Sequence, residues 1–109
     1  MDCQLAEATK CFLCGFNRAA AVLSASAVES RLKRISGFDR FATFAELVAA
    51  ARRAAGFSER IGDYARRVFA KRNAVVHQGT EPAQEDAGEV VTLARSALSD
   101  LPPAQDPAV

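Results

Sequence analysis

Residues 43–58, TFAELVAAARRAAGFS, contain the signals for one complete helix and for the start of the next. Thr43 and Glu46 have the spacing of a capping box, in which the hydroxyl and the carboxylate each accept a free backbone amide of the first turn. Gly56 favours the left-handed conformation that ends a helix, and Ser58 is a good cap for the following one. The stretch therefore predicts two helices joined by a tight turn.

The segment before residue 43 predicts one long helix. From Leu5 to Ile35, apolar or small side chains recur every three or four residues, as they do along one face of a helix. This stripe shifts after Ala27, which indicates either a bend or a new packing partner at that point. Gly37 is the expected end of the helix.

The segment after residue 58 predicts two more helices. One runs from Ser58 to about His77, with Gly79 as its terminator. The other follows Pro82 and continues to the pair Pro102-Pro103, which cannot extend a helix. No alternating strand pattern of useful length interrupts these segments.

These segments together predict an all-α fold. We expect an antiparallel bundle of four to five helices, in which the long first helix packs across the others. The chain has 109 residues, the usual size of one domain. Residues 1–101 are expected to form this single domain, and residues 102–109 a disordered tail.

The charge of the chain is balanced overall but uneven along the sequence. With 14 basic and 13 acidic residues, the net charge of +1 gives no general attraction to nucleic acid. Half of the basic residues nevertheless lie in the second and third expected helices. They are Arg52, Arg53, Arg60, Arg66, Arg67, Lys71 and Arg72. This local excess indicates either phosphate binding or ordinary solvated charges on helix faces.

The sequence offers no sign of a membrane segment, a secretion signal or a cofactor. Its apolar stretches are far shorter than the ~20 residues that cross a bilayer, and its start lacks basic residues. Three cysteines cannot all pair within one chain, so we expect free thiols in a reducing cytoplasm. Cys3, Cys11, Cys14 and His77 are numerous enough for a zinc ion. Their spacing is irregular, however, and small buried cysteines are the default expectation.

Arg72 stands out among the charges of the third expected helix, because it lies in the middle of that helix's apolar arc. The arc consists of Ile61, Tyr64, Ala65, Val68, Val75 and Val76. A guanidinium is costly to bury alone, so a carboxylate, an aqueous cleft or a phosphate should accompany it. Asn73 and His77 are four residues apart on the adjoining edge, so three polar groups converge there. The alternatives are a structural ion pair or snorkelling arginine, and a histidine that caps terminal carbonyls.

The segment Arg72-Asn73-Ala74-Val75-Val76-His77 resembles the signature of HEPN domains. That signature consists of an arginine, a polar residue, a variable spacer and a histidine, near the end of an internal helix. Earlier in the chain, Glu29 followed by Lys33 and Arg34 resembles a second pattern of that family. For this pattern the alternative is an ordinary intrahelical pair between Glu29 and Lys33. The likeness covers roughly residues 5–100.

The resemblance implies a metal-independent endoribonuclease with a composite site at a homodimer interface. By this resemblance His77 transfers a proton, Arg72 holds a phosphate, and Asn73 orients either the histidine or the phosphate. The residues it implicates in substrate binding are Glu29, Lys33, Arg34 and Lys71. RNA or a nucleotide is the implied ligand, no cofactor is needed, and an antitoxin or neighbouring gene product is a possible further partner.

Two other interpretations of the sequence are open. The chain has no Trp, and Tyr64 is expected on the core face, so no RNA-stacking surface is evident. A non-catalytic nucleotide- or RNA-binding module fits this composition, as does a purely structural dimeric helical protein. In the structural case Arg72 should have a carboxylate partner in the core.

Overall fold

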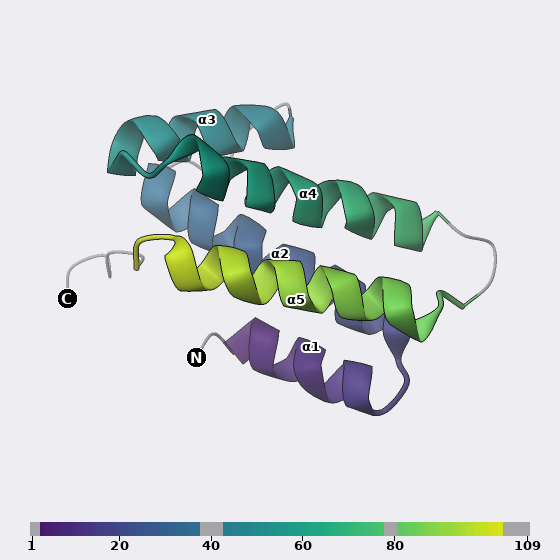
Figure 1. Ribbon diagram of the computed structural model, residues 1–109. Coiled ribbons are helices and arrows are strands. Elements are labelled where there is room, and N and C mark those ends of the chain that lie inside the picture. The colour runs from purple at the N-terminus through teal and green to yellow at the C-terminus, as the bar shows by residue number, and fades with distance from the viewer. Residues whose placement is uncertain (1–2, 38–42, 78–80, 104–109) are drawn as a thin grey trace.

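The computed structural model describes residues 3–37, 43–77 and 81–103, and within these ranges the chain forms five α-helices and no strand (Figure 1). In chain order they are α1 (Cys3–Leu13), α2 (Asn17–Ser36), α3 (Phe44–Ala55), α4 (Glu59–Val76) and α5 (Gln84–Asp100). The predicted all-α class and the helical bundle are confirmed.

The predicted long first helix is wrong, because the chain reverses between α1 and α2 (Figure 1). The amide of Gly15 donates to the carbonyl of Phe12 at 3.1 Å, and that of Phe16 donates to the carbonyl of Cys11 at 2.8 Å. Together with the φ of 82° at Gly15, these two bonds form a Schellman motif. The three-and-four spacing continues across the turn, since both helices face the same core. Periodicity alone therefore does not reveal the reversal.

The ends of α2 and α3 follow the sequence signals. Gly37 and Gly56 take up the left-handed conformation directly after these helices, as predicted. At the start of α3 the hydroxyl of Thr43 accepts the amide of Glu46 at 3.1 Å. The α3 helix therefore begins and ends where residues 43–58 predicted.

The predicted bounds of α4 and α5 are also confirmed to within a few residues. The Ser58 hydroxyl accepts the amide of Ile61 at 3.4 Å and caps α4. The α5 helix stops one residue before the buried Leu101, which precedes the two prolines. The predicted terminator Gly79 lies outside the described residues, as does the predicted tail from residue 104 onward.

The core lies around α2, which packs against each of the other four described helices. The α1 and α3 helices lie on opposite sides of α2, α4 and α5, which all pack against one another (Figure 1). Leu32, Val28 and Val68 are among the largest fully buried side chains. Fully buried alanines such as Ala21 leave little side-chain bulk between helices, which allows close helix packing. None of the described helices is long and apolar enough to span a bilayer.

The segment that follows α4 is tied to the start of α2. Oε1 of Glu81 accepts the backbone amides of Asn17 and Arg18 at 3.1 and 3.2 Å, and Nδ2 of Asn17 donates to the carbonyl of Pro82 at 2.9 Å. The first amides of a helix lack partners within the helix, so the Glu81 carboxylate caps α2 from a distant part of the sequence. This contact fixes the residues that directly precede α5 relative to the start of α2.

The α4 helix is longer than α3, its antiparallel neighbour. Phe44, the first residue of α3, stacks against Phe69 of α4 with ring centroids 4.3 Å apart. Residues 70–76 of α4 therefore extend beyond the start of α3. This overhang carries Lys71, Arg72 and Asn73, and His77 directly follows it.

Candidate functional site

Arg72 lies half-buried on the α4 overhang. Its Nη1 donates to Oδ1 of Asn73 at 2.7 Å, and its Cζ lies 5.4 Å from the centroid of the Phe69 ring. Within residues 3–37, 43–77 and 81–103, no carboxylate lies within ion-pair distance of this guanidinium. The ion pair that a purely structural role requires is therefore not found in this part of the chain.

With the described residues, Arg72 makes one side-chain hydrogen bond, to Asn73. A guanidinium carries five N–H donors in one plane and accepts no hydrogen bond. The Asn73 carboxamide and the face of Phe69 hold that plane in place, through one hydrogen bond and a cation–π contact. A half-buried, oriented guanidinium of this kind is suited to bind an oxyanion through two parallel hydrogen bonds.

Phe69 and Phe44 are parts of this site that the sequence interpretation missed. Their rings are parallel within 3°, and Phe69 is the ring that Arg72 covers. The spacing of Phe69 and Arg72, three residues apart on one helix, was a signal that the two share a face. The pairing with Phe44 depends on the register between α3 and α4, which no local pattern contains.

His77 directly follows the last residue of α4 and is exposed. Its backbone amide donates to the carbonyl of Asn73 at 3.1 Å. Its imidazole makes no hydrogen bond or ion pair with any residue the structure describes, so the predicted side-chain cap of terminal carbonyls is not seen there. The structure thus joins the side chains of Arg72 and Asn73, and places His77 one turn beyond them.

Three of the four other predicted substrate-binding residues form ion pairs. Glu29 and Lys33 form an ion pair of 3.1 Å on α2, which is the ordinary intrahelical interaction, and Arg34 is exposed. Lys71 pairs with Glu89 of α5. In the described ranges no hydrogen bond or ion pair connects these residues with Arg72, Asn73 or His77. The structure does not bring the two predicted patterns into contact.

Tyr64 is half-buried and packs against the core, consistent with its predicted face. Its ring also lies beneath two guanidinium groups, with the Cζ atoms of Arg60 and Arg67 at 5.6 and 5.9 Å from the centroid. The Tyr64 hydroxyl accepts a hydrogen bond from Arg60 at 3.2 Å and raises the pKa of that guanidinium. These basic residues lie on the α5 side of α4 and are separate from the Arg72 contacts.

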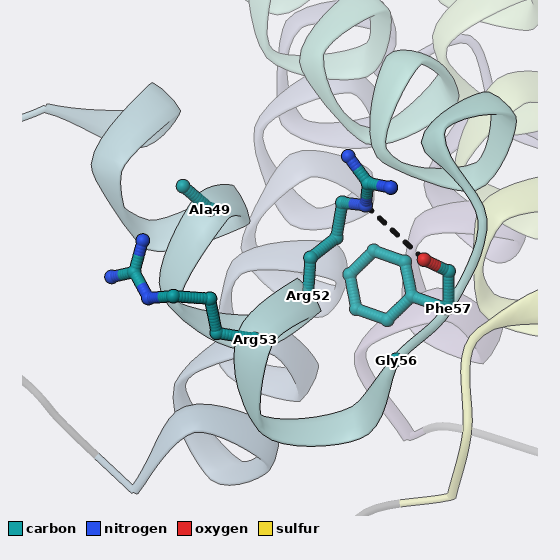
Figure 2. A pocket seen from close by; sticks show the side chains of 5 residues that line it. All are labelled: Ala49, Arg52, Arg53, Gly56 and Phe57. Atoms are coloured by element: carbon teal, nitrogen blue, oxygen red, sulfur yellow. Dashed lines mark hydrogen bonds between the residues drawn. The ribbon is translucent and has the colours of Figure 1, made fainter.

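A shallow pocket of about 370 Å³ lies at the turn between α3 and α4 (Figure 2). This turn is at the opposite end of α4 from His77. It is lined by Ala49, Arg52, Arg53, Gly56 and Phe57. Arg52 extends toward α4 and its Nε donates to the carbonyl of Phe57 at 3.1 Å, whereas Arg53 points to the other side (Figure 2). No carboxylate of the described residues lines this pocket.

The hairpin of α3 and α4 has a net positive charge, whereas the rest of the chain has a net negative charge. Residues 43–77 contain seven Lys or Arg against three Asp or Glu, whereas the rest of the chain contains seven against ten. Because the two helices are adjacent, this excess is concentrated on one part of the surface. The hairpin can attract a polyanion although the chain as a whole is nearly neutral.

The cysteines differ from expectation in their exposure. Cys3 and Cys14 are exposed and Cys11 is half-buried, so the prediction of small buried cysteines is wrong. The reversal after α1 places Cys14 at the turn instead of inside a continuous helix. Within the described ranges, no group of three or more His, Cys, Asp or Glu side chains is arranged to hold a metal ion.

Comparisons of the chain with known protein families, curated proteins and solved structures found no match.

Proposed function

We propose that the chain is an HEPN-like RNA-acting domain in which Arg72 and Asn73 bind a phosphate and His77 transfers a proton in metal-independent cleavage. The observation that carries this proposal is the environment of Arg72. Its guanidinium is half-buried and oriented by Asn73 and Phe69, and no carboxylate among the described residues neutralises it. An arginine held in this way has the donors and the charge that a phosphate requires.

The proposed reaction is the attack of a ribose 2′-oxygen on the adjacent phosphorus. The bond to the 5′-oxygen of the next nucleotide breaks, which leaves a cyclic phosphate and a free 5′-hydroxyl. Imidazole titrates near neutrality and is suited to remove the 2′-proton or to protonate the leaving oxygen. Arg72 stabilises the charge that develops on the phosphate oxygens.

One histidine in each chain is insufficient for both proton transfers. A homodimer whose two His77 residues line one cleft would supply an acid and a base, and the exposed position of His77 supports such a composite site. The proposed active unit is therefore a twofold dimer.

A second candidate function is phosphate or nucleotide binding without turnover. It is favoured by the ion pair between Lys71 and Glu89. Because the Lys71 ammonium is paired, it adds no free cation beside Arg72. Arg72 and Asn73 alone suffice for binding, whereas cleavage needs two proton-transfer groups.

RNA cleavage in the presence of a chelator distinguishes the two candidates. We expect the intact protein to cut single-stranded RNA in EDTA, and His77→Ala to lose this activity while retaining its helical circular dichroism. Arg72→Ala should lose binding as well as cleavage, and Arg67→Ala, which removes a charge from another side of α4, should keep both. Binding without cleavage by the intact protein would select the second candidate, and no interaction with RNA or nucleotides would exclude both.

A further inference from the structure

Residues of α3 and α4 that face each other form a line between the two helices, and this line ends at the candidate site. We call this line the α3–α4 seam. It is formed by Phe44, Val48 and Arg52 of α3 and by Gly62, Arg66, Phe69 and Asn73 of α4. The α4 members recur at intervals of four, three and four residues, the spacing of one helix face. The seam therefore connects the pocket at the turn with the overhang that carries Arg72.

Two arginine side chains meet over Gly62, in the part of the seam nearest the turn. A Cβ atom at Gly62 would lie 3.5 Å from Cδ of Arg52 and 3.9 Å from Nη1 of Arg66. Gly62 has no side chain, so both arginines can occupy the space above it. Two guanidinium-bearing side chains from different helices thus converge on one small region.

Among the described residues, Arg52 has no carboxylate partner and Arg66 has one, Asp63. Arg52 uses its Nε to bond a neutral backbone carbonyl, that of Phe57. Arg66 pairs with Asp63 on the surface of the same helix. An exposed pair of this kind contributes little to stability and leaves further guanidinium donors available. A phosphate that approached this place would find two cations and one carboxylate.

We propose that Arg52 and Arg66 form a second phosphate subsite, and that the substrate is single-stranded RNA of several nucleotides, long enough to reach from Arg72 to this subsite. This inference rests on the proposed function of Arg72. Arg66 precedes Arg72 by six residues, which is about 9 Å along the helix axis. The Phe44–Phe69 pair lies between the two basic positions.

The chain contains matched controls for this proposal. Arg66 and Arg67 are adjacent on α4, but Arg67 covers Tyr64 on the other side of the helix. Arg52 and Arg53 are adjacent on α3 and point to different sides of it (Figure 2). Each pair therefore compares the loss of the same charge on and off the seam.

The test measures binding of a labelled eight-nucleotide 2′-O-methyl RNA, which lacks the attacking hydroxyl, and of a dinucleotide of the same chemistry. Arg66→Ala should weaken binding of the longer probe about tenfold, the ratio that corresponds to one charge-assisted hydrogen bond. It should also lower the slope of log Kd against log salt by about 0.7. Binding of the dinucleotide should not change, and Arg67→Ala should bind both probes like the intact protein.

The second comparison measures binding of the same probes by Arg52→Ala and by Arg53→Ala. Because Arg52 donates to the carbonyl of Phe57 in the α3–α4 turn, circular dichroism checks that the Arg52→Ala variant remains folded. If Arg66→Ala and Arg67→Ala weaken binding equally, the charge acts diffusely and the subsite is excluded, although Arg72 and His77 can still function. If the intact protein binds neither probe, the proposed function fails together with this inference. If a polyglutamate peptide binds with the same dependence on Arg66, the surface recognises an acidic protein and the RNA subsite is excluded.

Discussion

The position of Arg72 is maintained by a carboxamide and an aromatic ring, which makes the shape of the guanidinium as important as its charge. Arg72→Lys keeps the charge but loses the planar set of donors and the stacking on Phe69. We expect RNA affinity to fall about tenfold in this variant. Fluorescence anisotropy with single-stranded RNA measures the change.

Lys71→Arg is the matched control, because the neighbouring side chain is directed to Glu89 of α5. This exchange should leave RNA affinity unchanged. Equal affinity of the Arg72→Lys variant and the intact protein would mean that Arg72 contributes only a diffuse charge.

The aromatic pair beneath Arg72 makes two contacts, the stacking of Phe44 on Phe69 and the cation–π contact of Phe69 with Arg72, and two variants separate their contributions to stability. Phe69→Leu removes both the stacking on Phe44 and the cation–π contact, and should lower the free energy of unfolding by about 1–2 kcal/mol. Phe44→Leu removes the stacking but leaves a phenyl ring beneath Arg72, so its stability loss should be smaller. Urea unfolding compares the two. An equal loss in both variants would show that the guanidinium gains nothing from the ring.

The α1–α2 reversal depends on Gly15, where the left-handed backbone disfavours any residue with a Cβ. No atom lies within 4 Å of the Cβ position, so the cost of Gly15→Ala is conformational and should be about 1 kcal/mol. Gly15→Asn should cost less, because asparagine tolerates this conformation. Thermal unfolding of the two variants tests the order, and an Ala variant as stable as the Asn variant would contradict the explanation.

The carboxylate of Glu81 replaces a local cap at the start of α2, where Phe16 offers no side-chain hydrogen bond. Glu81→Gln should lower the free energy of unfolding by about 0.5–1 kcal/mol and speed hydrogen exchange at the amides of Asn17 and Arg18. Glu85→Gln, in the first turn of α5, removes an equal charge and should change neither amide. Unchanged exchange in the Glu81 variant would mean that the helix start is stable without this contact.

Helix ends with local chemistry were predictable, and features created by tertiary contact were not. Thr43, Gly56 and Ser58 define their helix boundaries through bonds within a few residues. Gly15 carried the same kind of signal, but the continuing apolar stripe masked it. At the candidate site the polar residues of α4 were visible in the sequence. The contribution of Phe44, like the meeting of Arg52 and Arg66, depends on how α3 aligns with α4.

The distribution of charge over the whole molecule explains how a nearly neutral chain can bind a polyanion. The α3–α4 hairpin is basic, whereas residues 81–101 contain five acidic side chains and one arginine. These two regions are adjacent, because α4 packs against α5. The basic hairpin can therefore attract an RNA strand, whereas the acidic residues of 81–101 repel one.

The composite active site predicts that cleavage depends on the concentration of the whole protein. One exposed His77 in each chain provides a single proton-transfer group, so a monomer lacks either the acid or the base. Activity per chain should fall as the protein is diluted below its dimer dissociation constant. Sedimentation velocity and cleavage assays over the same concentration range test this expectation. The Arg67→Ala variant, altered outside the proposed site, should show the same dependence. If a sample that sediments as monomer keeps its full activity per chain, the second proton-transfer group belongs to the same chain, and the twofold site is wrong.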